Sequence, residues 1–311
     1  MEPPPDVRHL SDRSRLRATS PGKEAVLCGA GGTAPRQYGV VVLDDGAVEL
    51  TREQIVAHDD QRDLGPAGDT ALGAAYSHVF DGARALLDAG GGSGSAAPAL
   101  RASGSSVVIA DWSFSMLAAA RHRADLLCAA DLRCLPFRDG AFDGVHAAFA
   151  IQNVSDWRRA IAECVRVAQR DAPVVVAWGG PPEDDRLTGI ETAFFRALGH
   201  AAGVRAQGTG ITLRAANDCF AELGKPLQGT FTVKGTQTRT PRQIAERARL
   251  NPYRASADPG DREEAVKAAL SWAEAHVGPV DHPVSFRVAK VHHTYRSAAG
   301  QAPCAPPEKC R

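Results

Sequence analysis

Glycine residues and one carboxylate follow two apolar runs near the middle of the chain, and together they suit the binding of a nucleotide-like cofactor. The first run, "ALLDAGGGSG" from Ala85 to Gly94, ends in a glycine cluster, and the second run, "SVVIAD", ends in Asp111. Because only glycine permits both positive φ and close approach of the backbone to a ligand, the first run predicts a buried strand that enters a tight turn. The carboxylate of Asp111 could accept hydrogen bonds from both ribose hydroxyls of an adenosine.

The glycine spacing alone does not separate two classes of cofactor. Gly90, Gly92 and Gly94 alternate, but Gly92, Gly94 and Ala97 also satisfy the G-x-G-x-x-A pattern of dinucleotide binding. A nicotinamide-dependent reductase would in addition need a catalytic Y-x-x-x-K, and none of the chain's four tyrosines has a lysine four positions on. The reductase is therefore kept only as a minor alternative.

Sequence motifs after the glycine cluster distinguish between the two classes of cofactor, because they resemble those of a known family. From roughly Tyr76 to Gly180 the chain resembles the class I S-adenosylmethionine-dependent methyltransferases, in the small-molecule branch related to the ubiquinone and menaquinone biosynthesis methyltransferases. Four motifs occur in the family's order: "LLDAGGGSG", "ADWSFSMLAAAR", "ADLRCLPF" and "GAFDGVHAAFAIQNVSDW". One position departs from the family pattern, since Gly91 stands where the family often has cysteine.

The resemblance implies S-adenosylmethionine as the cofactor and assigns roles by position. The glycine backbone would pass under the methionine and ribose, Asp88 would orient the turn or meet the methionine ammonium through water, and Phe149 would border the methyl group. Trp112, Ser113 and Met116 would pack beside the adenosine, and Asp131 with Leu132 would contact the edge of the adenine. The cofactor-binding residues implied in this way are Tyr76, Asp88, Gly90, Gly91, Gly92, Gly94, Asp111, Trp112, Ser113, Met116, Asp131, Leu132 and Phe149.

Several of these residues also have a purely structural interpretation. Asp111 could be an acid at a helix N-terminus, Met116 could be helix core, and Tyr76 could simply pack between helix and sheet. Gln152 and Asn153 either reach the substrate or only stabilise their loop. For Asp143 we expect a capping or orienting role at the start of a strand.

The sequence identifies no catalytic base. An oxygen acceptor usually needs proton removal, whereas a neutral amine or an enol-activated carbon does not. The adjacent pair His292 and His293 alternate faces of a predicted strand, so at most one could reach the site. The histidines considered as bases are His78, His146, His200, His282, His292 and His293.

The residues from 84 onward alternate between strand and helix patterns, which predicts a parallel sheet with helices on both faces. Strands are expected near 84–89, 106–111, 127–131, 143–149 and 173–179, with two later strands at 229–240 and 284–296. Helices are expected near 69–83, 185–200, 213–223, 241–250 and 261–277. The fold class expected is α/β, a Rossmann-like class I methyltransferase with a seven-stranded sheet whose last strand is antiparallel, a helical cap and an N-terminal extension.

Three parts of the chain are expected. Residues 1–65 form an N-terminal extension with a disordered leader, a hairpin in "YGVVVLDDGAVELT" and a short helix capped by Thr51 with Gln54 three residues later. Residues 66–300 form the methyltransferase domain, with cap segments near 183–228 and 241–280. Residues 301–311 form a disordered tail.

Composition narrows the class of protein. The 36 basic and 36 acidic residues balance, so no global field attracts nucleic acid or acidic membranes. There is no apolar run of about 18 residues, no secretory signal core near the N-terminus, and no C-x-x-C among the seven cysteines, so no metal site is expected. We expect a cytoplasmic enzyme that methylates a small organic acceptor, with no nucleic-acid or membrane partner and with a homodimer left open. Two further alternatives stay open: an RNA-base methyltransferase and a non-catalytic S-adenosylmethionine-binding protein.

Overall fold

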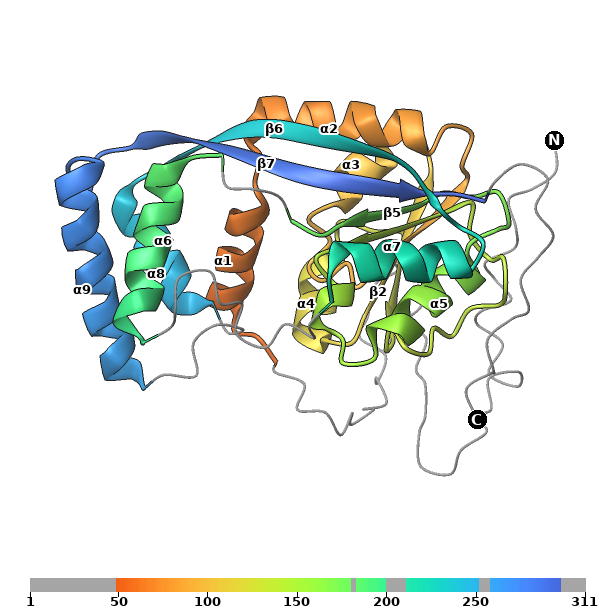
Figure 1. Ribbon diagram of the computed structural model, residues 1–311, viewed down its shortest axis with the longest axis horizontal. Helices are drawn as coiled ribbons and strands as arrows, with labels where there is room; N and C mark the ends of the chain where they lie inside the picture. Colours follow the sequence, from red (N-terminus) through yellow and green to blue (C-terminus); the bar gives the residue numbers. More distant parts are fainter. Residues whose placement is uncertain (1–48, 180–182, 200–210, 252–257, 298–311) are drawn as a thin grey trace.

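A seven-stranded sheet forms the centre of the protein, in the order β3-β2-β1-β4-β5-β7-β6 (Figure 1). The computed structural model describes residues 49–179, 183–199, 211–251 and 258–297. Its first five strands are parallel, β7 is antiparallel to β5, and β6 is antiparallel to β7. The strands are β1 (Ala85–Ala89), β2 (Ser106–Asp111), β3 (Leu126–Ala129), β4 (Gly144–Ala148), β5 (Val174–Ala177), β6 (Leu227–Arg239) and β7 (Val284–Tyr295). This arrangement confirms the expected fold class.

Helices cover both faces of the sheet, because successive side chains of each central strand point to opposite faces and both sets are buried. Leu87, Val145 and Val176 belong to one hydrophobic core with α5 (Trp157–Val167) and α7 (Leu213–Glu222). Leu86, Ile109 and Val175 belong to the opposite core, with α2 (Gly65–Val79) and α3 (Ala97–Arg101). A further helix, α4 (Phe114–Ala120), follows β2, and a short 3-10 turn, Ile151–Asn153, follows β4.

The ribbon of β6 and β7 continues past the last β5 partner and carries a small helical cap at its far end (Figure 1). The final β5–β7 pair is Ala177 with His292, whereas β6 and β7 stay paired as far as Arg239 and Val284. Three helices pack together there: α6 (Asp185–Ala197), α8 (Pro241–Leu250) and α9 (Pro259–His276). Their buried residues, among them Phe194 of α6, form a separate hydrophobic cluster with Phe286 of β7.

The position of α7 differs from the expectation that all helices between the fifth and seventh strands belong to the cap. Phe220 of α7 stacks on Tyr295 of β7 with ring centroids 3.9 Å apart, and α7 contacts α5. The apolar stripe of α7 is therefore buried against the sheet. The cap of the described chain consists of α6, α8 and α9.

The helix α1 (Arg52–Arg62) stands between the sheet and the cap, and it contacts both α4 and α8 (Figure 1). Its N-terminus is a capping box in which Thr51 accepts from the amide of Gln54 and the Gln54 side chain accepts from the amide of Thr51, as predicted. The predicted leader, most of the hairpin and the tail lie outside the described residues. Within the described ranges, no helix combines the length and the apolar character needed to cross a membrane.

Candidate cofactor site

The glycine turn lies at the carboxyl end of β1, where ligands bind in parallel α/β sheets. Gly90 has φ of +68° and Gly92 has φ of +55°, a region that side chains other than glycine rarely adopt. The amide of Gly90 donates to the carbonyl of Ala110, 2.7 Å away, which fixes the turn to the neighbouring strand. A Cβ on Gly90 would collide with the side chain of Ala150, so the turn also needs glycine to let the loop after β4 approach.

Asp111 connects the tip of β2 to this turn. Its carboxylate is buried and accepts from the amides of Gly92 and Ser113, each at 2.9 Å. Burial raises the pKa of Asp111 to about 6. The two expected partners of one cofactor, the glycine turn and the acid at the second strand, are therefore in direct contact.

The residues expected beside adenosine also gather here. Ser113 caps α4 by accepting from the amide of Met116, Met116 is buried, and Trp112 is 37% exposed. The Met116 methyl lies 3.7 Å from the place that a Cβ on Gly92 would occupy. Met116 thus borders the turn as well as packing in the helix core.

The adenine-edge pair and Phe149 lie around the same turn. Leu132 is buried, with a methyl 3.2 Å from the place of a Cβ on Gly90, whereas the Asp131 carboxylate forms a fork with Arg133 at 2.7–3.1 Å. Phe149 has φ of +56°, and the guanidinium of Arg62 lies 5.3 Å from its ring centroid. Such a backbone conformation is uncommon for a bulky residue, and it is found here at the end of β4 that faces the turn.

A buried polar chain runs under the turn on the α2 side of the sheet. His146 Nδ1 lies 2.8 Å from Asp88 Oδ1, and its Nε2 lies 2.7 Å from the Tyr76 hydroxyl. That hydroxyl lies 3.4 Å from Nδ1 of His292. Tyr76 is 1% exposed, so its position is the one described by the structural interpretation, between helix and sheet.

The other candidate residues have mostly structural contacts. Asn153 donates to the carbonyl of Phe149 at 2.8 Å, and Asp143 accepts from the amides of Arg84 and Ala85 at 2.9 and 3.0 Å, the orienting role expected for it. Gln152 is buried. These contacts stabilise the loop and the strand start.

The histidines differ widely in their surroundings. His78 and His282 are exposed, and His200 lies outside the described residues. Burial lowers the pKa of His292 to about 3, and it also lowers the pKa of His293 on the opposite face of β7. Among the described residues, no group of three His, Cys, Asp or Glu side chains could hold a metal ion.

Sequence reasoning missed the part that α1 plays. Asp59 accepts from Ser93 of the glycine turn and from Arg123 at 2.7 Å, and His58 lies beside Gly92. Burial lowers the pKa of His58. The acidic run "HDD" from His58 could have drawn attention, but nothing in the sequence shows which loop those side chains would meet.

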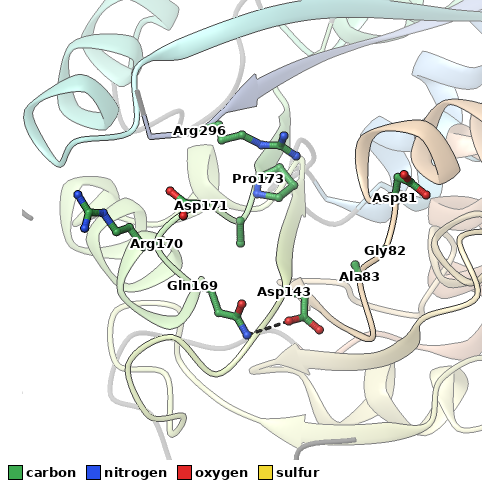
Figure 2. A pocket seen from close by; sticks show the side chains of 10 residues that line it. Asp81, Gly82, Ala83, Asp143, Gln169, Arg170, Asp171, Pro173 and Arg296 are labelled. Atoms are coloured by element: carbon green, nitrogen blue, oxygen red, sulfur yellow. Dashed lines mark hydrogen bonds between the residues drawn. The ribbon is translucent and has the colours of Figure 1, made fainter. Parts of the chain in front are cut away.

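A hollow of about 480 Å³ lies at the opposite edge of the sheet, near the amino ends of β1, β4 and β5 (Figure 2). Asp81, Asp143, Gln169 and Arg296 are among the residues that line it, and Figure 2 shows the hydrogen bond from Gln169 to Asp143. None of the residues expected to bind cofactor lines this hollow. It is therefore separate from the candidate site.

Comparison with known proteins agrees with this geometry. Residues 87–176 match the family described as "Methyltransferase domain". The chain is 39% identical over 121 residues to the demethylmenaquinone methyltransferase of Thermus thermophilus, which covers 36% of this chain and 55% of that protein. It is 36% identical over 94 residues to the demethylmenaquinone methyltransferase of Renibacterium salmoninarum, covering 30% and 40%. A solved structure, the YcgJ protein of Bacillus subtilis, overlays with a TM-score of 0.46 at 18% identity, covering 74% of this chain and 99% of that one.

The sheet order, the glycine turn, the family match over residues 87–176 and the sequence relatives are similar to those of a class I S-adenosylmethionine-dependent methyltransferase domain. The domain is similar to that of the demethylmenaquinone methyltransferases. The chain spans about half the length of the curated relatives it matches.

Proposed function

We propose that this protein transfers a methyl group from S-adenosylmethionine to a small organic acceptor with an oxygen, nitrogen or carbon nucleophile, in the biosynthesis of a metabolite or natural product. The observation that carries the proposal is the hydrogen bond between Gly92 of the glycine turn and Asp111, at the carboxyl ends of β1 and β2 within the matched domain. Neutral overall charge and the small-molecule character of the relatives' printed names support an organic acceptor over RNA.

The hydrogen-bond acceptors and the glycine turn of the candidate site fit S-adenosylmethionine. Asp111 keeps lone pairs beyond its two backbone hydrogen bonds, which suits a ribose diol. Oδ2 of Asp88 is buried and receives no hydrogen bond from any described residue, so it is able to accept from a cationic ligand group. The three consecutive glycines of the turn, Gly90, Gly91 and Gly92, would present backbone without side chains to the ligand.

Catalysis in this proposal is mainly a matter of position. When bound, the cofactor would supply a sulfonium methyl that is already activated, and this methyl would pass to the nucleophile while the sulfur keeps the bonding electrons. In this proposal Asp111 and the glycine turn hold the cofactor, and Asp59 of α1 accepts a hydrogen bond from Ser93 of that turn. Holding the reactants in line in this way would raise the rate.

The first test is calorimetric titration of the protein with S-adenosylmethionine, NADH and NADPH. We expect S-adenosylmethionine alone to bind, and we expect Asp111→Ala to weaken it at least about tenfold, because a charge-assisted hydrogen bond contributes about 1.5–3 kcal/mol. Asp261→Ala, which removes an exposed acid in the first turn of α9, is the matched control and should leave the affinity unchanged. Binding of a nicotinamide cofactor alone would overturn the proposal.

The cytoplasm is the proposed setting of this reaction. A homodimer is the assembly we propose to test, by light scattering of the purified protein. A mass of one chain, 32.8 kDa, would exclude it.

A further inference from the structure

The polar chain beneath the glycine turn is unusual because it occupies positions where a sheet normally buries apolar side chains. Asp88 and His146 are register partners on β1 and β4, and both are at most 1% exposed. Leu86 lies two residues before Asp88 on β1, and Val175 on β5 pairs with His146. Both side chains lie on the same face of the sheet and belong to its apolar core. Burying polar groups costs free energy unless they are hydrogen-bonded, so a well-packed apolar pair would serve stability better.

The directions of the hydrogen bonds follow from the chemistry of the groups. An ionised Asp88 can only accept, so His146 donates from Nδ1, and its Nε2 then accepts from the Tyr76 hydroxyl. The oxygen of Tyr76 is left to accept from Nδ1 of His292. Every donor therefore points along the chain toward Asp88.

One oxygen at the end of this chain has no donor. Oδ2 of Asp88 is buried, and no described residue donates a hydrogen bond to it. It lies under the glycine turn, 2.5 Å from the place that a Cβ on Gly91 would occupy. A buried carboxylate oxygen in this state is satisfied when a ligand brings a donor.

The cofactor has only two kinds of nitrogen-bound donor, the adenine amino group and the α-ammonium, because a sulfonium has no N–H. The adenine is expected beside Met116 and Leu132, which border the turn toward β2 and β3. The α-ammonium is then the donor left for Asp88, and its charge is opposite to that of the carboxylate.

We propose that His146, held in place by Tyr76, is a positioning residue that aims Asp88 at the α-ammonium of the cofactor, an inference that rests on the proposed function. His146 does not touch the cofactor. It fixes the carboxylate through Oδ1 and leaves Oδ2 directed at the turn. Without that hydrogen bond, the carboxylate rotates and its buried charge loses its one side-chain donor.

Two substitutions at the same position separate this role from packing. The amide nitrogen of His146→Asn can take the place of Nδ1 and keep the hydrogen bond to Asp88, whereas His146→Gln reaches the place of Nε2 and keeps only Tyr76. The probes are S-adenosylhomocysteine, which has the α-ammonium, and 5′-methylthioadenosine, which lacks the whole amino acid portion. The affinity of each probe is measured by calorimetry on the full chain, with thermal denaturation of every variant.

We expect His146→Gln to weaken S-adenosylhomocysteine about tenfold or more and to leave 5′-methylthioadenosine within about twofold, since a charged hydrogen bond is lost for one probe only. His146→Asn should keep the wild-type ratio of the two affinities. Tyr76→Phe is an independent test that does not depend on the folding of the His146 variants. It should lower the affinity for S-adenosylhomocysteine relative to that for 5′-methylthioadenosine by about threefold.

The outcomes distinguish this inference from the proposed function. If His146→Gln and Tyr76→Phe change both probes equally, or change neither, the positioning role is wrong while cofactor binding stands. If the wild-type protein binds neither probe, the proposed function fails, and the inference fails with it.

Discussion

Both faces of the central sheet bury an apolar core, but they differ near the carboxyl ends of β1 and β4. On the face covered by α5 and α7, Leu87, Val145 and Val176 are fully buried in an apolar core. On the α2 face, Asp88 and His146 are equally buried but polar, at the equivalent places one residue along the same strands. At this place the face covered by α5 and α7 only stabilises the fold, whereas the α2 face buries polar groups that the proposed function uses for a ligand.

Breaking the apolar face should have the largest effect on stability. Leu87→Ala removes a fully buried side chain from the centre of that core and should lower the free energy of unfolding by about 2–5 kcal/mol. Chemical denaturation measures this loss, and calorimetry at low temperature should show unchanged affinity for S-adenosylmethionine. A large fall in affinity without a fall in stability would contradict the assignment of this face.

The polar α2 face should make the affinity for S-adenosylmethionine depend on pH. Asp111 lies on that face, two residues beyond Ile109, which pairs with Asp88, and burial raises its pKa to about 6. Hydrogen bonds from a ribose favour the ionised carboxylate, so affinity should be constant above pH 6 and should fall as pH drops below it, by up to about tenfold per unit. Titrations at pH 7.5 and 5 measure this. Asp111→Asn should bind more weakly at pH 7.5 but without that dependence, and an equal pH dependence in the variant would refute it.

A second effect of pH should appear in the acid stability of the polar face. Burial lowers the pKa of His292 to about 3 from 6.5, so between these values the unfolded chain binds a proton that the folded protein does not. The free energy of unfolding must then fall as pH decreases from about 6.5 toward 3. His292→Asn lacks this proton, so the stability difference between wild type and variant should shrink over that range. A constant difference would mean that His292 titrates normally. Asp111 acts in the opposite sense below pH 6, but it is present in both proteins.

The smallest effect expected is that of a hydroxyl on the apolar face. Tyr295 donates to Asn217 at 2.7 Å and accepts from Trp178 at 3.2 Å. Tyr295→Phe should lower the free energy of unfolding by about 0.5–1.5 kcal/mol and leave the affinities for both nucleoside probes unchanged. The matched Tyr76→Phe should change the ratio of those affinities. If both substitutions changed it, the two faces would not differ as described.

Local sequence patterns predicted most of the sheet and the glycine turn. β2 was expected at 106–111 and lies at Ser106–Asp111, and α8 was expected at 241–250 and lies at Pro241–Leu250. Both are bounded by short-range features, an acid at a strand tip and the Thr240 capping box before a proline. Differences are confined to ends, such as α2, which begins at Gly65 instead of near residue 69.

Contacts between distant segments were not predictable in the same way. The Asp88–His146 hydrogen bond depends on the register of β1 against β4, across a separation of 58 residues. The placement of α7 against α5 depends on which apolar stripe finds a partner, and the amphipathic pattern of α7 is compatible with either the sheet or the cap. The cofactor-binding roles of the individual side chains remain predictions.

Two consecutive acids of α1 connect parts of the protein that are otherwise joined by the β6–β7 ribbon. Asp59 is hydrogen-bonded to Ser93 and Arg123 beside the glycine turn, while Asp60 is hydrogen-bonded to Arg239 and Arg247 beside the cap. A rigid helical turn holds these attachments within one residue of each other. Because both sets of hydrogen bonds start from one turn of α1, this single helix couples the position of the cap to that of the glycine turn.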